Sequence, residues 1–447
     1  MQLPEALLES LTDVKGFNKN SFEQVHASGE KVTSVRMNPD KLSIANCQLS
    51  IDNKVPWTQF GFYLKERPSF TFDPLFHAGC YYVQEASSMF LEQAMKQTVD
   101  LSKPLKVLDL CAAPGGKSTH LLSLLSKESL LVSNEVIRSR ANILTDNIIK
   151  WGNSNVLVTN NDPRDFHLLE NYFDVIVVDA PCSGSGLFRR DPDAMDEWSL
   201  NNVALCSQRQ QRILADVLPA LKKEGVLIYS TCSYSKDEDE EIVNWLTKEL
   251  PVANCQLSIE SDWGITSSDG GYRFWPDQIK GEGFFIVCFR KTEGEDSFQY
   301  FKKQKTEKFS TADLNVLDKY LFKDGLSFLK VGKIVHAVPE NIFDEMNFLA
   351  SKLRVVNMGL RIGEIIRDKL VPDHALALSG VVADNINRIS LNYEQAILYL
   401  KKKEIKIEEK QKGWSLVTFN EHPLGWVNVL PSRVNNYYPK ELRILKD

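Results

Sequence analysis

The sequence predicts an α/β protein built around a mainly parallel β-sheet, and three observations lead to this prediction. Short apolar runs rich in Val, Ile and Leu recur through the middle third of the chain. Stretches with helical spacing separate these runs, so strands and helices alternate as they do in βαβ units. The chain has 447 residues, of which 43% are hydrophobic and 25% charged, an ordinary globular composition that exceeds one typical domain in length. We therefore expect a central sheet with helices on both faces, flanked by further domains.

Six apolar runs are predicted to form the strands of this sheet. They are residues 105–110, 130–136, 155–159, 173–179, 225–231 and 283–289. The helical stretches of the same region are 116–126, 138–151, 199–222 and 237–250. The last of these begins with "DEDEE", and negative charge in the first turn favours a helix because of the helix dipole. Outside this region we predict a helix at 4–13, a strand at 32–37, and helices at 341–352 and 392–403.

Composition divides the chain into four parts. Residues 1–95 form a small α+β module, 96–292 the central domain, 293–325 a polar and charged linker, and 326–447 a C-terminal region. The whole chain has a formal charge of −6, yet 326–447 carries 18 Lys and Arg against 14 Asp and Glu. A modestly basic region is compatible with a phosphate-bearing partner.

Eight cysteines are scattered along the chain, at positions 47, 80, 111, 182, 206, 232, 255 and 288. Because no CxxC pair and no Cys/His cluster with zinc spacing occurs, we predict no metal site. Reduced thiols fit a cytoplasmic protein better than disulfides do. No basic segment with an apolar core follows Met1, and no run approaches 18 apolar residues, so we expect neither secretion nor a membrane span.

The first strand of the central domain runs into "LDLCAAPGGKSTHLL", a loop of small residues that leads into a helix. A phosphate-binding P-loop requires G-x-x-x-x-G-K-[ST], and Gly116, Lys117 and Ser118 match its end. Cys111 stands at the first glycine position, however, and Pro114 lacks an N–H that would face phosphate. A P-loop ATPase therefore stays an alternative from a different functional class.

Acidic residues follow the next two strands. The second strand ends at Glu135, and Asp162 follows the third in "NND". Carboxylates at these places accept hydrogen bonds from ribose hydroxyls. A small-residue loop without a pyrophosphate signature, combined with two carboxylates, suits a nucleoside without phosphates such as S-adenosylmethionine. The alternative is that each carboxylate caps the helix that follows it.

Two cysteines follow strands of the same sheet. Cys232 lies in "IYSTCSY", and Cys182 lies in "VVDAPCSGSG" close behind Asp179. Since ligands of parallel sheets bind beyond the carboxyl ends of the strands, we expect these side chains to meet at one edge. A buried cysteine on its own is usually a small hydrophobe, and we interpret Cys111 and Cys206 in this way.

Several of these segments together resemble a known family. "LDLCAAPGGKS", "VVDAPCSGSG" and "YSTCSY", in this order, resemble the NOP/Sun family of RNA cytosine-5 methyltransferases, as do "HAGCYYVQEASSM", "RRDPDAMDEW" and "SVRMNP". The C-terminal "HPLGWVN…YYPKELR" is similar to the PUA-like end of the bacterial small-subunit rRNA branch. The resemblance implies a Rossmann-like class I S-adenosylmethionine-dependent methyltransferase core, with a small α+β N-terminal RNA-binding module and a PUA-like C-terminal RNA-binding region. The family usually has Thr where Ser118 stands, and Ser keeps the hydroxyl.

The resemblance also implies roles for the site residues. Carbon 5 of cytosine is not nucleophilic, so a thiolate must first add to carbon 6, and Cys232 matches the family's nucleophile. Cys182 matches the residue that releases the product. Asp179 is expected to hydrogen-bond the cytosine ring. That Lys117 orients Asp179 is a hypothesis that rests only on the proximity of the strand ends. The residues expected to bind the cofactor are Ala112, Ala113, Pro114, Gly115, Gly116, Lys117, Ser118, Glu135, Asp162 and Asp179.

The expected reaction is therefore formation of 5-methylcytosine in ribosomal RNA, with 16S rRNA of the small subunit as substrate, by a monomeric enzyme that uses S-adenosylmethionine. The catalytic core leaves a tRNA cytosine-5 methyltransferase open, and a non-catalytic RNA-binding factor of ribosome assembly is a further alternative. We also expect that removing the chain after about residue 300 spares cofactor binding but reduces methylation, because the basic C-terminal region would read the RNA.

Overall fold

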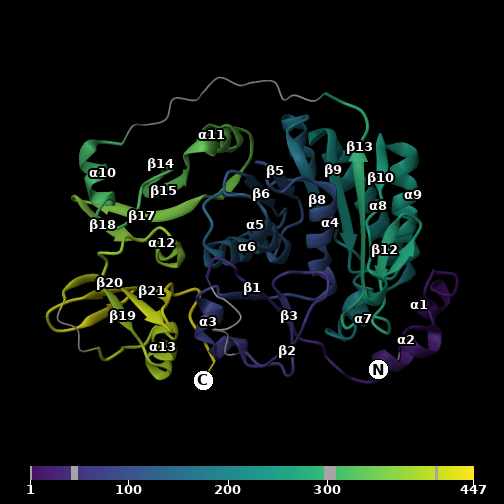
Figure 1. Ribbon diagram of the computed structural model, residues 1–447, viewed down its shortest axis with the longest axis horizontal. Coiled ribbons are helices and arrows are strands. Elements are labelled where there is room, and N and C mark those ends of the chain that lie inside the picture. Colours follow the sequence, from purple (N-terminus) through teal and green to yellow (C-terminus); the bar gives the residue numbers. More distant parts are fainter. Residues whose placement is uncertain (1–2, 42–48, 296–308, 408–410, 447) are drawn as a thin grey trace.

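The computed structural model describes residues 3–41, 49–295, 309–407 and 411–446. Its centre is a ten-stranded mixed sheet, and three four-stranded sheets lie to the left of it and below it in Figure 1. Five neighbouring strands, β9, β8, β5, β6 and β7, are parallel, which confirms the predicted α/β class. In spatial order the strands of the central sheet are β11 (Thr266–Ser268), β12 (Gly271–Phe274), β13 (Phe284–Lys291), β9 (Leu221–Thr231), β8 (Phe173–Asp179), β5 (Lys106–Asp109), β6 (Leu130–Asn134), β7 (Val156–Thr159) and β16 (Val355–Met358), and β10 (Val252–Cys255) pairs with β13.

Both faces of the central sheet are buried, as parallel sheets require. Successive residues of one strand belong to two different hydrophobic clusters, Val107 to one and Leu108 to the other. The helices of the central domain are α4 (Leu91–Thr98), α5 (Gly116–Leu124), α6 (Arg138–Trp151), α7 (Ala194–Glu197), α8 (Leu200–Val217) and α9 (Glu240–Glu249). Residues of α4, α5 and α6 pack into the cluster of Val107, whereas residues of α8 and α9 pack into that of Leu108.

The predicted elements of the central domain are present, and the structure adds β10, β11 and β12, which were not predicted. The main boundary shifts concern two helices and the start of β9. The predicted helix 138–151 coincides with α6. The predicted helix 199–222 ends earlier, because Pro219 lies in a 3₁₀ turn and β9 already begins at Leu221. The predicted helix 237–250 starts as a 3₁₀ turn, Lys236–Glu238, before α9.

The N-terminal module combines an antiparallel sheet of order β2-β3-β1-β4 with three short helices. Its elements are α1 (Glu5–Ser10), α2 (Lys19–Ala27), β1 (Ser34–Met37), β2 (Ile51–Lys54), β3 (Gly61–Leu64), α3 (Pro74–His77) and β4 (Tyr81–Val83). Side chains of α1 and α2 pack against Tyr234 and Trp275 of the central domain, next to α7 (Figure 1). The module is therefore attached to the central domain through a shared apolar cluster.

The C-terminal region holds two further sheets, of orders β14-β15-β17-β18 and β19-β20-β21-β22. Its strands are β14 (Leu326–Val331), β15 (Ile334–Pro339), β17 (Leu360–Ile366), β18 (Lys369–Pro372), β19 (Arg388–Ser390), β20 (Gly413–Phe419), β21 (His422–Val429) and β22 (Val434–Asn436). Its helices are α10 (Thr311–Leu317), α11 (Phe343–Lys352), α12 (His374–Leu378) and α13 (Tyr393–Leu400). Within the predicted linker 293–325, residues 296–308 lie outside the described part of the chain, and α10 occupies part of the remainder.

The C-terminal region packs tightly onto the rest of the molecule. Strand β16 pairs antiparallel with β7 and so extends the central sheet, with Met358 opposite Leu157. One hydrophobic cluster contains Val35 of the N-terminal module together with Val427 of β21, from opposite ends of the chain. In the part of the chain that the structure describes, no helix has the length and apolar character needed to cross a membrane.

Candidate active site

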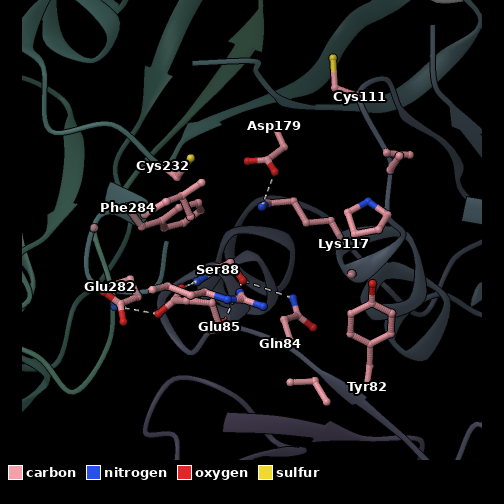
Figure 2. Close-up of a pocket in the computed structure, with 18 residues that line it drawn as sticks. Tyr82, Gln84, Glu85, Ser88, Cys111, Lys117, Asp179, Cys232, Glu282 and Phe284 are labelled. Atoms are coloured by element: carbon pink, nitrogen blue, oxygen red, sulfur yellow. Dashed lines mark hydrogen bonds and ion pairs between the residues drawn. The ribbon is translucent and has the colours of Figure 1, made fainter. Parts of the chain in front are cut away.

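A cavity of about 430 Å³ opens at the carboxyl edge of the central sheet (Figure 2). Its volume falls within the range of about 300–1,000 Å³ that is usual for small-molecule sites. The ends of three parallel strands, the start of β13 and the segment after β4 surround it. The residues around it include Tyr82, Gln84, Glu85, Ser88, Cys111, Ala112, Ala113, Pro114, Gly116, Lys117, Asp179, Arg190, Cys232, Glu282 and Phe284.

The two predicted cysteines meet at this cavity. Cys232 follows the end of β9 and lines the cavity, and Cys182 lies behind it. The two Sγ atoms are 3.0 Å apart and share a hydrogen bond. This hydrogen bond, together with burial, raises the pKa of the Cys182 thiol well above its ordinary value. Cys182 is therefore placed to keep its proton while it faces the other sulfur.

Asp179 is held in place from two sides at the end of β8. Ser230 Oγ donates a hydrogen bond to Asp179 Oδ1 at 2.8 Å, and Lys117 Nζ lies 2.8 Å from Asp179 Oδ2 (Figure 2). Lys117 itself stands 5.1 Å over the ring of Phe284. About a third of the Asp179 side chain, 36%, stays exposed, so this carboxylate is oriented yet accessible from the cavity. The expected orientation of Asp179 by Lys117 is present.

A buried carboxylate joins the loops that carry the two cysteines. Glu238 accepts hydrogen bonds from the backbone N–H of Ser183 at 2.8 Å and from its hydroxyl. It also accepts one from the hydroxyl of Ser233 at 2.6 Å. Ser183 follows Cys182 and Ser233 follows Cys232, so one side chain fixes both loops. Burial raises the pKa of Glu238 above its ordinary value.

Glycine allows the Cys182 loop to lie against the backbone of Cys232. The N–H of Gly186 donates to the carbonyl of Cys232 at 2.8 Å. A Cβ on Gly186 would lie 2.5 Å from that oxygen, closer than any real contact. Gly184 has a φ of +77°, a left-handed conformation that glycine adopts without strain. The pattern "CSGSG" is thus required by the loop geometry that brings the sulfurs together.

The loop between β5 and α5 forms the floor of the cavity and fits a ligand that lies against the backbone. The first N–H groups of α5, from Gly116 on, have no acceptor within the helix, as at any helix start. Gly115 has a φ of +113°. Arg140 Nη2 donates to the carbonyl of Ala113 at 2.9 Å and Asn147 Nδ2 to that of Pro114 at 2.8 Å, which holds the loop open toward the cavity.

Four of the residues expected to bind the cofactor do not line the cavity, namely Gly115, Ser118, Glu135 and Asp162. The Ser118 hydroxyl donates to buried Asp109 at 2.6 Å. Glu135 accepts the N–H of Ile137 at 2.9 Å. Asp162 caps the 3₁₀ helix Pro163–Leu169 in a capping box, so for this carboxylate the capping alternative describes the observed contacts.

The structure adds residues that the sequence left unassigned. Residues 82–85 come from the N-terminal module, Glu282 from the segment before β13, and Phe284 from the first position of β13. Because β13 runs antiparallel to β9, its first residue lies at the edge where the parallel strands end. The motif "HAGCYYVQEASSM", which is part of the family resemblance, contains residues 82–85 and could have indicated that they belong to the site. Cys111, expected in the core, packs against the core cluster of Leu108 and also borders the cavity, because it lies just beyond the end of β5 at Asp109.

Among the described residues no group of three or more His, Cys, Asp and Glu side chains is placed to hold a metal ion. Cys206, interpreted as a core residue, is indeed 5% exposed.

Comparison with known proteins relates all three parts of the chain to one family. The family described as 16S rRNA methyltransferase RsmB/F matches residues 96–290. The N-terminal domain of 16S rRNA methyltransferase RsmF matches 3–86, and the methyltransferase RsmF PUA domain matches 386–444. The last match confirms the expected PUA-like C-terminal region.

Two relatives cover most of the chain. The Ribosomal RNA small subunit methyltransferase F of Shewanella woodyi is 34% identical over 379 residues, 81% of this chain and 79% of the relative. The protein of the same name from Shewanella loihica is 30% identical over 436 residues, 92% of this chain and 88% of the relative.

A solved structure, that of NSun6 from Pyrococcus horikoshii with SFG, superimposes with a TM-score of 0.56 at 20% identity. It covers 65% of this chain and 99% of that chain, and it supports the predicted Rossmann-like methyltransferase fold. With these matches, the chain belongs to the RsmB/F family of S-adenosylmethionine-dependent 16S rRNA methyltransferases.

Proposed function

We propose that this protein methylates carbon 5 of a cytosine in the RNA of the small ribosomal subunit, with S-adenosylmethionine as methyl donor. One observation carries the proposal. A single cavity contains a cysteine with a second thiol 3.0 Å behind it, a lysine-held aspartate and the backbone of the small-residue loop. Direct methyl transfer needs the base and the donor in one cavity, and the names of the relatives favour small-subunit rRNA over tRNA.

Cys232 is proposed to act first. Its thiolate forms a bond to carbon 6 of the cytosine, and the electrons of the carbon 5–carbon 6 double bond become available at carbon 5. Asp179, oriented by Lys117 and Ser230, accepts a hydrogen bond from the exocyclic amine, and its protonated form donates a proton to N3 and so stabilises the electron-rich adduct. The bound cofactor supplies the methyl group that carbon 5 takes up.

Cys182 is proposed to complete the reaction. The proton on carbon 5 must leave before the sulfur–carbon 6 bond can break and restore the aromatic ring. Cys182 lies close enough to the sulfur of Cys232 to reach the adduct between Cys232 and cytosine, and Glu238 holds the loop of Cys182 in place. We assign Cys182 to this release step, as the family resemblance implies.

The residues that would hold the cofactor are those of the loop, Ala112–Lys117, through backbone N–H groups and close contact with small side chains. Glu135 stays the proposed ribose ligand, because it stands at the end of β6 and lies 3.6 Å from Arg140 beside the loop. Asp162 is occupied as a helix cap, and we propose that it supports the loop after β7 rather than binding the ribose directly.

Two alternative functions, a P-loop ATPase and a non-catalytic assembly factor, are disfavoured. A P-loop ATPase requires a phosphate-binding loop, and family membership assigns this loop to a methyltransferase instead. A non-catalytic assembly factor has no need for two thiols in hydrogen-bond contact beside an oriented carboxylate.

The experiment that tests the proposal maps 5-methylcytosine by bisulfite sequencing in 16S rRNA and tRNA from cells with and without the gene. We expect one site in 16S rRNA to lose methylation when the gene is removed, and full-length protein to restore it. Loss of a tRNA site instead, or no loss at any site, would overturn the proposed substrate.

Two cysteine variants of the full chain then test the assigned roles. Cys232→Ala should abolish methylation without forming a protein–RNA adduct, because no thiolate attacks. Cys182→Ala should trap the adduct, visible as a slowly migrating band on a denaturing gel, because only release is blocked. Cys206→Ala is the matched control and should behave as wild type. If Cys182→Ala abolished the reaction and Cys232→Ala formed the adduct, the roles would be reversed.

A further inference from the structure

The catalytic cavity continues into a second groove of about 270 Å³ on the N-terminal module. The two share five lining residues, Val83, Gln84, Glu85, Arg190 and Glu282, so they form one continuous cleft. We infer that this groove holds the phosphates of the RNA strand next to the target cytosine. The inference rests on the proposed function and extends it by naming where the flanking strand binds.

Three cationic side chains from separate segments converge on the groove. Lys31 precedes β1, Arg67 follows β3, and Arg190 lies in the loop after the Cys182 segment. All three residues are exposed. Within the described residues, none of them lies within ion-pair distance of a carboxylate. Arg67 rests with its guanidinium 5.2 Å from the centre of the Phe70 ring. Unpaired cations that face a common groove are suited to bind phosphates.

Buried contacts hold the walls of this groove in place. Arg189, only 8% exposed, donates from Nη2 to the carbonyl of Glu30 at 3.0 Å and from Nη1 to that of Gly281 at 2.9 Å. It therefore ties the segment before Lys31 to the segment before Glu282. Lys31 and Arg190, which adjoin these contacts in the chain, thus lie on backbone that is held in place before RNA binds.

The two carboxylates of the groove are engaged by groups other than these cations. Glu85 accepts the backbone N–H groups of Ser87, Ser88 and Glu282, each at 2.9 Å. Glu282 lies 3.5 Å from buried Arg189. Among the described residues neither carboxylate forms a direct ion pair with Lys31 or Arg67, and Glu282 interacts with Lys31 and Arg190 only at longer range.

An RNA strand is the occupant that this arrangement favours. A cytosine in the cavity must be turned out of its stack, and its own sugar and neighbouring nucleotides must then leave through the mouth of the cavity. The groove adjoins the cavity through shared residues, so the flanking phosphates pass the three cations. Such contacts position the strand and do not read its sequence.

The test uses the full-length protein with both Lys31→Ala and Arg67→Ala, and a 12-nucleotide oligocytidylate as probe. Binding is measured by fluorescence anisotropy over a series of KCl concentrations. Each phosphate contact contributes about 0.7 to the slope of log K against log salt for single strands, so the double variant should lose about 1.4. Its affinity at low salt should fall about tenfold or more, whereas its affinity for S-adenosylmethionine should not change.

Lys54→Ala is the matched control, because Lys54 is an exposed lysine on β2 of the same module and does not line the groove. It should keep the wild-type slope. An unchanged slope in the double variant would overturn the groove inference. The proposed function would remain intact in that case, provided that the wild-type protein methylates 16S rRNA. A double variant that binds the oligonucleotide normally but loses methylation of assembled small subunits would point to an acidic ribosomal protein as the occupant, and would also overturn it. Absence of wild-type methylation would instead refute the proposed function.

Discussion

Glu238 brings the two thiols of the active site together, although it lies outside the cavity. Its carboxylate binds the residues that follow Cys182 and Cys232, and it is fully buried. A carboxylate suits this position because two hydroxyls and one N–H all need an acceptor there. The distance between the sulfurs thus depends on a residue that touches neither substrate nor cofactor, and Glu238 is a positioning residue.

Replacement of Glu238 should therefore impair release more than attack. Glu238→Ala leaves the buried N–H of Ser183 without its acceptor, at a cost of about 1–3 kcal/mol, and leaves the two hydroxyls only longer contacts, such as the one of 3.4 Å with each other. We expect kcat to fall about tenfold to a hundredfold and a fraction of the enzyme to remain as RNA adduct, as in Cys182→Ala. Glu238→Gln, which keeps one oxygen acceptor, should recover part of kcat.

The adduct fraction distinguishes this role from general destabilisation, since a partly unfolded enzyme would lose activity without trapping RNA. The thermal midpoint and the affinity for S-adenosylmethionine serve as controls. Unchanged kcat in Glu238→Ala would show that the loops keep their positions without this carboxylate.

Strand β5 and helix α5 are joined beneath the loop that lines the cavity. Asp109, the last residue of β5, accepts the hydroxyl of Ser118 from the first turn of α5 at 2.6 Å. Its other carboxylate oxygen is buried without a hydrogen-bond partner. Burial raises the pKa of Asp109 from 3.8 to about 7. The protonated form is therefore favoured at the junction of these two elements below about pH 7.

The stability of the protein should then depend on this carboxyl group between about pH 4 and 7. Below pH 3.8 both states keep the proton, whereas between 3.8 and about 7 only the unfolded chain releases it. The native state binds more protons in this window, so its contribution to stability is lost as pH rises. The expected loss is on the order of 4 kcal/mol over three pH units.

Asp109→Asn should remove this part of the pH dependence, because an amide does not titrate. Urea unfolding at several pH values between 4 and 8 measures it. Exposed Asp262→Asn is the control and should keep the wild-type dependence. Parallel curves for wild type and Asp109→Asn would contradict the assignment.

At the scale of the whole molecule, the C-terminal region packs against both the central sheet and the N-terminal module. Strand β16 completes the sheet beside β7, and Leu353 and Met358 are buried in the core cluster of the central domain. Tyr438, near the end of the chain, lies with its hydroxyl 3.3 Å from His77 Nδ1 of the N-terminal module. The C-terminal region supports the fold of the methyltransferase as well as carrying the PUA domain.

A chain that ends after residue 300 should therefore be unstable, in contrast to the sequence-based expectation that cofactor binding survives. Removal of four buried side chains of this cluster, Met346, Leu349, Leu353 and Met358, forfeits about 1.5–3 kcal/mol each, which together approaches the stability of a whole domain. We expect aggregation or a strongly lowered thermal midpoint, measured by circular dichroism, and weak binding of S-adenosylmethionine.

Met358→Ala in the full chain tests the same contact without truncation. A loss of about 2–5 kcal/mol is expected for a buried methionine, with RNA-binding residues untouched. A truncated protein with native stability and unchanged cofactor affinity would show that the central domain is independent of β16.

The sequence by itself determined the main strands and helices of the central domain. Apolar runs of strand length and the helical period of 138–151 are local signals, and they placed β5 to β9 and α6 correctly. The meeting of Cys182 and Cys232 also followed, because parallel strands connected by helices all end at one edge of a sheet. The family resemblance supplied the roles of these residues, and the matches over the three parts of the chain confirmed the family.

Only the tertiary structure decided which side chains reach the cavity and which are used elsewhere. Asp162 and Ser118 stand at the expected places in the sequence but are occupied by a helix cap and by Asp109. Residues 82–85 and β16 come to the central domain from distant segments. Local periodicity records which face of an element is buried, but it does not record the partner, because packing between distant segments depends on the shape and polarity of both surfaces together.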